Sequence, residues 1–132
     1  MAGAVRLGDA MDNTPAALKH RTKKFALDVL RFMSRQPYTE DARAIRQQLI
    51  RSAASVGANY RAACRSRSRA EFIARIGVAL EEADESAFWL ELLIDGRLTT
   101  APIANDLRQE ADELCAILAA SSITARAHGH NP

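Results

Sequence analysis

Residues 49–63 read LIRSAASVGANYRAA, and residues 52–58 within them are almost wholly small side chains. Apolar residues recur every three or four positions through this stretch, at Leu49, Ala53, Val56 and Tyr60. That spacing predicts an α-helix with one buried face. Gly57 lowers helix propensity by about 1 kcal/mol relative to alanine, and we expect the close approach of another helix to offset this cost. The stretch therefore predicts a closely packed bundle of helices.

Three further segments show the same helical spacing. The first of the four helical segments runs from about residue 18 to 34. The second contains residues 49–63 and begins near Thr39, a good N-cap. The third begins at Ser68 with a Ser-x-x-Glu capping box and ends near Gly96, a favourable C-terminal residue. The last runs from about residue 102 to 120. Four such segments with short connections predict an all-α fold, an antiparallel up-down-up-down four-helix bundle.

The chain is expected to divide into a flexible N-terminal arm (1–17), the four-helix bundle (18–120) and a flexible C-terminal tail (121–132). Glycine and proline interrupt the arm, and the tail loses apolar periodicity. No apolar run of about 18 residues occurs, and the first ten residues do not resemble a signal peptide. We therefore expect a cytoplasmic protein without a membrane partner, in which Cys64 and Cys115 are reduced thiols.

The net charge of +2 conceals a strong asymmetry along the chain. Residues 1–75 hold 15 of the 18 Lys and Arg and 6 of the 16 Asp and Glu, a net charge of +9. Residues 76–132 hold the other 3 basic and 10 acidic residues, a net charge of −7. A chain divided in this way either pairs its two halves or presents a strongly charged face to a partner.

A longer pattern surrounds the opening stretch. It comprises residues 49–63, Arg65, Ser68, the triplet Glu71-Phe72-Ile73, and residues 81–92, which read EEADESAFWLEL. Residues 21–26, RTKKFA, add to it in the first predicted helix. Together they resemble the family of four-helix-bundle proteins encoded in intervening sequences of bacterial 23S rRNA genes. The resemblance covers about residues 18–120, and residues 55–63, SVGANYRAA, are its most specific part.

The resemblance implies a four-helix bundle that assembles with itself into a homo-oligomeric ring, a pentamer. A related bundle is a nucleic-acid-binding accessory protein for the reverse transcriptase of diversity-generating retroelements. RNA or DNA contact is therefore expected, with RNA favoured. The resemblance brings no catalytic residues and no cofactor, so we expect a non-enzymatic protein. The alternative is a protein–protein scaffold or accessory subunit without a direct nucleic-acid role.

Arginine is the residue type most concentrated near the middle of the chain. Between residues 42 and 75 there are eight arginines and a single acid, Glu71. Arginine suits bidentate phosphate contacts better than lysine does. We therefore expect nucleic-acid contacts from Arg51, Arg61, Arg65, Arg67 and Arg69. The alternative is structural: cations favour the C-terminus of a helix, and several arginines could pair with the acids of the third helix.

The remaining candidates concern packing and assembly. We expect Asn59 to bond the backbone of a neighbouring helix or the hydroxyls of Ser52 and Ser55, which would fix the packing register. The expected packing residues are Ser55, Gly57, Asn59 and Tyr60. Phe88 and Trp89 are expected either at a subunit interface, where aromatic residues concentrate, or in ordinary core packing. The three histidines lack the spacing of a bundle metal site, so no metal is expected.

Overall fold

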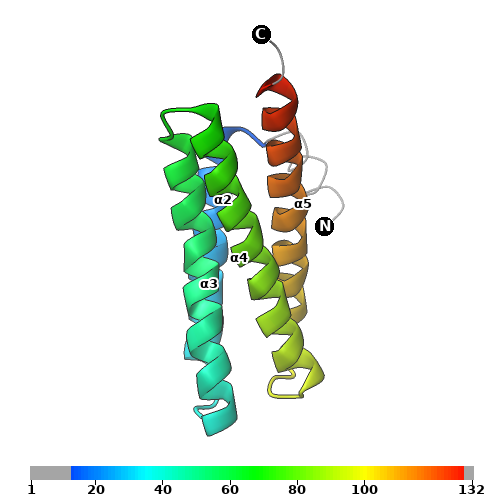
Figure 1. Ribbon diagram of the computed structural model, residues 1–132. Helices are drawn as coiled ribbons and strands as arrows, with labels where there is room; N and C mark the ends of the chain where they lie inside the picture. The colour runs from blue at the N-terminus through cyan, green and yellow to red at the C-terminus, as the bar shows by residue number, and fades with distance from the viewer. Residues whose placement is uncertain (1–12, 130–132) are drawn as a thin grey trace.

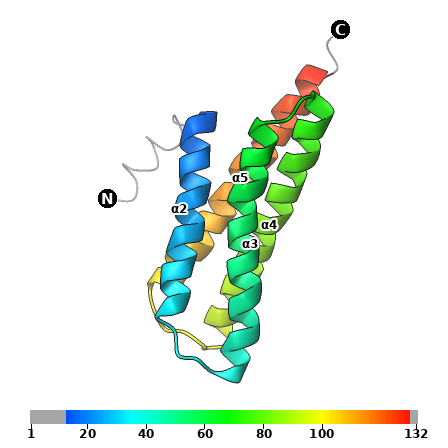
Figure 2. The same ribbon diagram turned by 90° about the vertical axis from the view of Figure 1, so that its left-hand side faces the viewer.

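The computed structural model describes residues 13–129, which contain four α-helices: α2 (Pro15–Ser34), α3 (Glu40–Cys64), α4 (Arg69–Asp95) and α5 (Ile103–Gly129). Successive helices run in opposite directions and are joined by short loops (Figure 1). Helices α2 and α4 lie at opposite corners, each between α3 and α5 (Figure 2). The all-α four-helix bundle predicted from the sequence is therefore confirmed.

Hydroxyl side chains begin three of the helices. Thr14, Thr39 and Ser68 each accept a hydrogen bond from the backbone N–H three residues later, at 3.2, 3.2 and 3.1 Å. The caps at Thr39 and Ser68 are those expected from the sequence. Helix α2 begins at Pro15, three residues before the predicted start, because Thr14 caps it and proline loses nothing by lacking an N–H at the first position.

The C-terminal boundary of the bundle differs from the prediction. Residues 121–129 continue α5, so the expectation of an irregular tail is wrong for them, whereas residues 130–132 and residues 1–12 of the expected arm lie outside the described part. The buried positions of α5 are Ala104, Leu107, Ala111, Leu114, Leu118 and then Ser122. A small polar residue thus continues the buried face, and hydropathy alone does not register it.

The turn after α4 places its special backbone conformation one residue later than expected. Gly96 has an ordinary φ of −77°, whereas Arg97 is left-handed with φ 57°. The N–H of Arg97 donates to Ile94 O at 3.1 Å, and the N–H of Leu98 donates to Leu93 O at 2.9 Å. This is the Schellman arrangement, in which the residue after the cap is usually glycine.

Large apolar side chains from all four helices fill the centre. Phe25, Met33, Leu49, Ile76, Leu90, Leu93, Leu114 and Leu118 are among those fully buried. One polar contact crosses this core: the hydroxyls of Ser52 and Ser86 lie 2.8 Å apart between α3 and α4. Ser86 also donates to Glu82 O at 2.8 Å, so both buried hydroxyls have partners, as buried polar groups require.

Helix α2 is the least integrated of the four. It packs mainly on α3 and approaches α5 at few points, whereas α4 packs on both α3 and α5 along most of its length. Figure 2 shows α2 standing apart from α5 over much of the bundle. Side chains that join α2 to α5 therefore have a large share in closing the bundle.

Candidate nucleic-acid interface

The connection between α3 and α4 collects four of the predicted arginines at one end of the bundle, the upper end in Figure 1. Helix α3 ends at Cys64, and α4 begins at Arg69 under the Ser68 cap. This short connection confines Arg61, Arg65, Arg67 and Arg69 to nine residues of chain. All four side chains are exposed, and none has an ion-pair partner within residues 13–129.

The fifth predicted arginine lies elsewhere. Arg51 sits on α3 some ten residues before this end, where its guanidinium pairs with Glu82 at 3.2 Å and with Glu85. Its pKa is raised, first by the hydrogen bond that it donates to Glu85 and also by the charge of Glu82. Arg51 therefore takes the structural alternative, pairing with acids of α4, and we remove it from the candidate interface.

Asn59 does not bridge helices. Its amide donates to the backbone oxygen and to the hydroxyl of Ser55, both at 2.9 Å, and both acceptors belong to α3 itself. Of the two alternatives expected, the bond to the hydroxyl of Ser55 is present and the bond to a neighbouring helix is not. Asn59 therefore hydrogen-bonds within its own helix and does not fix the packing register between helices.

Gly57 faces α2 at the point of close approach expected from the sequence. A Cβ atom added there would lie 3.5 Å from the backbone and hydroxyl oxygens of Thr22. Thr22 is fully buried, and its hydroxyl donates to Leu18 O at 2.8 Å. Tyr60, one turn after Gly57, is also buried at 3% exposure. Gly57 and Tyr60 thus lie in helix packing, as expected.

Phe88 and Trp89 differ in their surroundings. Phe88 is 52% exposed, whereas Trp89 is half-buried and donates its indole N–H to Glu85 at 2.9 Å. Their rings meet edge to face, with centroids 5.2 Å apart. Val78 and Leu92, which the sequence analysis did not single out, are also exposed on α4. The sequence contained a signal for them: Val78 lies ten residues before Phe88 and Leu92 four residues after it, and helical periodicity puts all three on one face.

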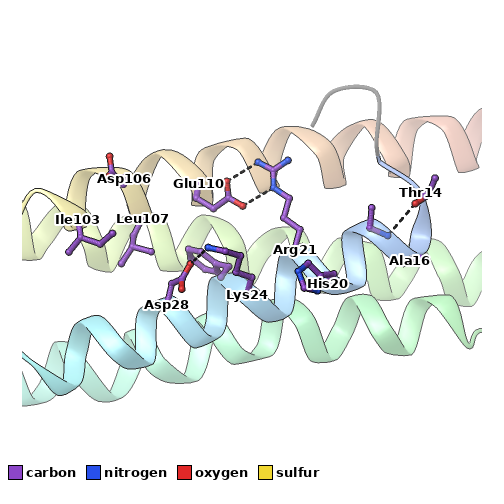
Figure 3. A pocket seen from close by; sticks show the side chains of 12 residues that line it. Thr14, Ala16, His20, Arg21, Lys24, Asp28, Ile103, Asp106, Leu107 and Glu110 are labelled. Atoms are coloured by element: carbon purple, nitrogen blue, oxygen red, sulfur yellow. Dashed lines mark hydrogen bonds and ion pairs between the residues drawn. The ribbon is translucent and has the colours of Figure 1, made fainter. Parts of the chain in front are cut away.

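The groove between α2 and α5 holds the ion pairs that join these helices (Figure 3). Arg21 of α2 donates to both carboxylate oxygens of Glu110 at 2.7 Å, and to Glu113 at 2.8 Å. On α2 itself, Lys24 pairs with Asp28 at 2.6 Å. Arg21 belongs to the family pattern in the sequence, but nothing in the sequence indicates its partners on α5. The charged groups of this 780 Å³ groove therefore largely neutralise one another.

The ion pairs between residues far apart in the sequence explain part of the charge asymmetry. Arg21 and Arg51 belong to the basic half of the sequence, and the acids that they meet on α4 and α5 belong to the acidic half. The two halves therefore pair with each other across the bundle. The four arginines at the α3–α4 connection remain outside this pairing, which leaves one end of the described bundle with uncompensated positive charge.

Other kinds of site are not formed by the described residues. Within residues 13–129 no three His, Cys, Asp or Glu side chains gather where they could hold a metal ion, and no helix is long and apolar enough to span a membrane. Cys64 and Cys115 are free thiols. Burial, and then the charges of Asp84 and Asp112, raise the pKa of Cys115 to about 11, so this thiol stays protonated at neutral pH.

These features define a class of protein, a small antiparallel four-helix bundle. Ion pairs join its helices, and arginines without carboxylate partners in the described chain lie at one end. The model of the 23S rRNA-intervening sequence protein family matches residues 17–120. The chain belongs to this family, in agreement with the resemblance read from its sequence.

A solved structure supports the same assignment. The chain is similar to a protein of unknown function from the S23 ribosomal protein family of Bacteroides thetaiotaomicron, with a TM-score of 0.73 and 28% sequence identity. The match covers 82% of this chain and 96% of the other. Comparison with curated proteins gave no match.

Proposed function

We propose that this protein binds structured RNA through the arginine end, defined as Arg61, Arg65, Arg67 and Arg69. The observation that carries the proposal is that all four guanidinium groups are exposed and lack carboxylate partners within the described bundle. Phosphate contacts from arginine provide most of the affinity for nucleic acid and lower it as salt rises. The role is one of binding rather than catalysis.

RNA binding is tested by fluorescence anisotropy with a structured RNA hairpin over a range of salt concentrations. If the four arginines each contact a phosphate, affinity falls roughly 100-fold between 50 and 200 mM salt. Changing all four to glutamine should remove most of this affinity and flatten the salt dependence. A DNA hairpin of the same sequence measures the preference for RNA.

The matched control removes the same charge from another place. Lys23, Arg35, Arg43 and Arg97 are exposed and have no carboxylate partner in the described chain. Changing these four to glutamine lowers the net charge equally and should leave most of the RNA affinity intact. Equal losses in the two quadruple variants would mean that net charge, and not the arginine end, carries the binding.

We further propose that the protein is a homo-oligomer, a ring for which the family resemblance implies five subunits. Val78, Phe88 and Leu92 support this, because they expose an apolar stripe along one face of α4. Glu81 lies within this stripe, between Val78 and Phe88, and Asp84 and Glu91 lie beside it. All three acids are exposed and have no cation partner among the described residues. An apolar stripe flanked by unpaired charge is typical of a protein interface.

Light scattering coupled to size exclusion tests the assembly. A pentamer of the 14.4 kDa chain would have a mass of about 72 kDa, five times that of the monomer. Changing Phe88 and Leu92 together to serine should reduce the mass while leaving the helical circular dichroism unchanged. A wild-type monomer would contradict self-assembly and favour the second candidate function, in which the same stripe binds a different protein and the chain is an accessory subunit.

A further inference from the structure

A second pocket, of about 820 Å³, opens at the end of the bundle that carries the free arginines. All four helices contribute to it: Leu18 from α2, Tyr60 from α3, Arg69 and Phe72 from α4, and Ile117 from α5. Its volume lies within the roughly 300–1,000 Å³ typical of small-ligand sites. Arg69 therefore belongs both to the arginine end and to the wall of this pocket.

The interior of the pocket is apolar and aromatic. Leu18, Tyr60 and Ala63 form buried parts of its lining, and Phe72 and Ile117 are half-buried there. The α5 wall is made mostly of small side chains, namely Ala116, Ala120, Ser121, Thr124 and Ala125. Small side chains on one wall and the half-buried ring of Phe72 on another leave a space that suits a flat, apolar group.

The charged side chains that line the pocket determine whether it favours an anionic or a cationic ligand. Arg69 and His128 line it, and no Asp or Glu does so among the described residues. Burial, and then a hydrogen bond with Cys64, raise the pKa of Tyr60, so the phenol stays neutral at physiological pH. The groove between α2 and α5 differs, because its own acids neutralise its cations. The pocket at the arginine end therefore favours an anion that carries an apolar part.

We propose that this pocket takes an unpaired nucleotide of the bound RNA, with its base inside and its phosphate on Arg69. Arg69 and Phe72 lie three residues apart on α4, which places them side by side on one helix face. Arg61, Arg65 and Arg67 are exposed at the same end of the bundle, where they can contact further phosphates of the RNA. Base stacking on aromatic side chains gives affinity without demanding a particular sequence.

This inference rests on the proposed RNA binding and narrows it to RNA with an unstacked base. In the sequence, no aromatic residue lies between the arginines except Tyr60 at their edge. The fold supplies what the sequence order lacks, since it brings Phe72 of α4 and Tyr60 of α3 to the pocket that Arg69 also lines.

The test compares two RNA hairpins that differ by a single base. Both carry one bulged nucleotide, which is normal in the first hairpin and abasic in the second, so that the number of phosphates is equal. The wild-type protein should bind the first hairpin about 10-fold more tightly, the effect of one stacked base. With 2-aminopurine as the bulged base, binding should quench its fluorescence, which a phosphate contact alone would not do.

Pocket variants locate the effect. Ala120→Leu fills the pocket from an exposed position, and Phe72→Leu removes the ring while keeping an apolar side chain. Both should abolish the preference for the intact base and leave the affinity for the abasic hairpin unchanged. Ala44→Leu, at an exposed position of α3 outside the pocket, is the matched control and should keep the preference.

The outcomes separate this inference from the function on which it rests. Equal binding of the two hairpins by the wild type would overturn the pocket assignment while RNA binding itself stands. A preference that persists in Ala120→Leu would also overturn it, by moving the base to another surface. Failure to bind either hairpin would overturn both the proposed function and the inference.

Discussion

The backbone of Arg97 has a conformation that normally belongs to glycine. Its φ of 57° is needed for the Schellman turn that closes α4, and a side chain in this region costs about 1–2 kcal/mol. The preceding Gly96 does not relieve this cost, because its own φ is −77°. The sequence favours Gly96 as the C-terminal residue, and the hydrogen bonds of the turn decide the one-residue offset.

Arg97→Gly should stabilise the protein. The change removes the side chain from a left-handed residue, and after the larger conformational entropy of glycine in the unfolded chain is deducted, the gain is about 0.5–1 kcal/mol. Urea denaturation measures it. Arg75→Gly removes the same charge within α4, where glycine should instead cost about 1 kcal/mol. A destabilised Arg97→Gly protein would contradict the strain assigned to this turn.

At the scale of a pair of elements, a network of charges joins the outer faces of α3 and α4. Arg51 of α3 pairs with Glu82 and Glu85 of α4, and Trp89 donates its indole N–H to Glu85. The hydrogen bond from Trp89, followed by the contact with Arg51, lowers the pKa of Glu85 below its ordinary value of 4.5. The ionised carboxylate is therefore favoured in the folded state.

Glu85→Gln should destabilise the protein at neutral pH and lose this effect in acid. Because the folded-state pKa of Glu85 is lowered, its stabilising contribution is complete above pH 4.5 and disappears as the pH falls through the lower folded value. The free energies of unfolding of wild type and variant should therefore converge below pH 4.5. Urea denaturation at a series of pH values measures the difference, and a pH-independent gap would show that Glu85 acts through packing alone.

At the scale of the whole molecule, the bundle is closed by a contact between its first and last helices. Helix α2 approaches α5 at few points, and Arg21 supplies a bidentate bond to Glu110 and a further bond to Glu113 there. The arginine side chain is only 17% exposed. Its removal would leave two neighbouring carboxylates without the cation between them.

Arg21→Gln should therefore cost about 1–3 kcal/mol of stability, the usual penalty for a partly buried charged group that loses its partner. Urea denaturation measures the loss, and amide hydrogen exchange should show α2 opening first. Arg108→Gln is the control: it breaks the exposed pair with Asp112 within α5 and should cost no more than about 0.5 kcal/mol. Equal costs would mean that Arg21 does not hold α2 to α5.

The sequence by itself determined the helices, the class of fold and the family. Apolar spacing around Leu49, Val56 and Tyr60 and the caps Thr39 and Ser68 are local signals, and each is reproduced in the bundle. The close approach expected at Gly57 is also present. It could be predicted because a position without a side chain is visible in the sequence. The crowding of four arginines before and within the start of α4 was likewise visible, since they are near neighbours in the chain.

Only the tertiary structure decided which charges are free and which are paired. Arg21 meets Glu110 some 89 residues away, and Arg51 meets Glu85 some 34 residues away, whereas Arg61 and Arg65 meet no acid in the described bundle. The pocket at the arginine end likewise unites residues from all four helices. Helical periodicity says which face of a helix is buried, but ion pairs and pockets depend on how the helices are rotated and offset against one another, which the packing of the whole core determines.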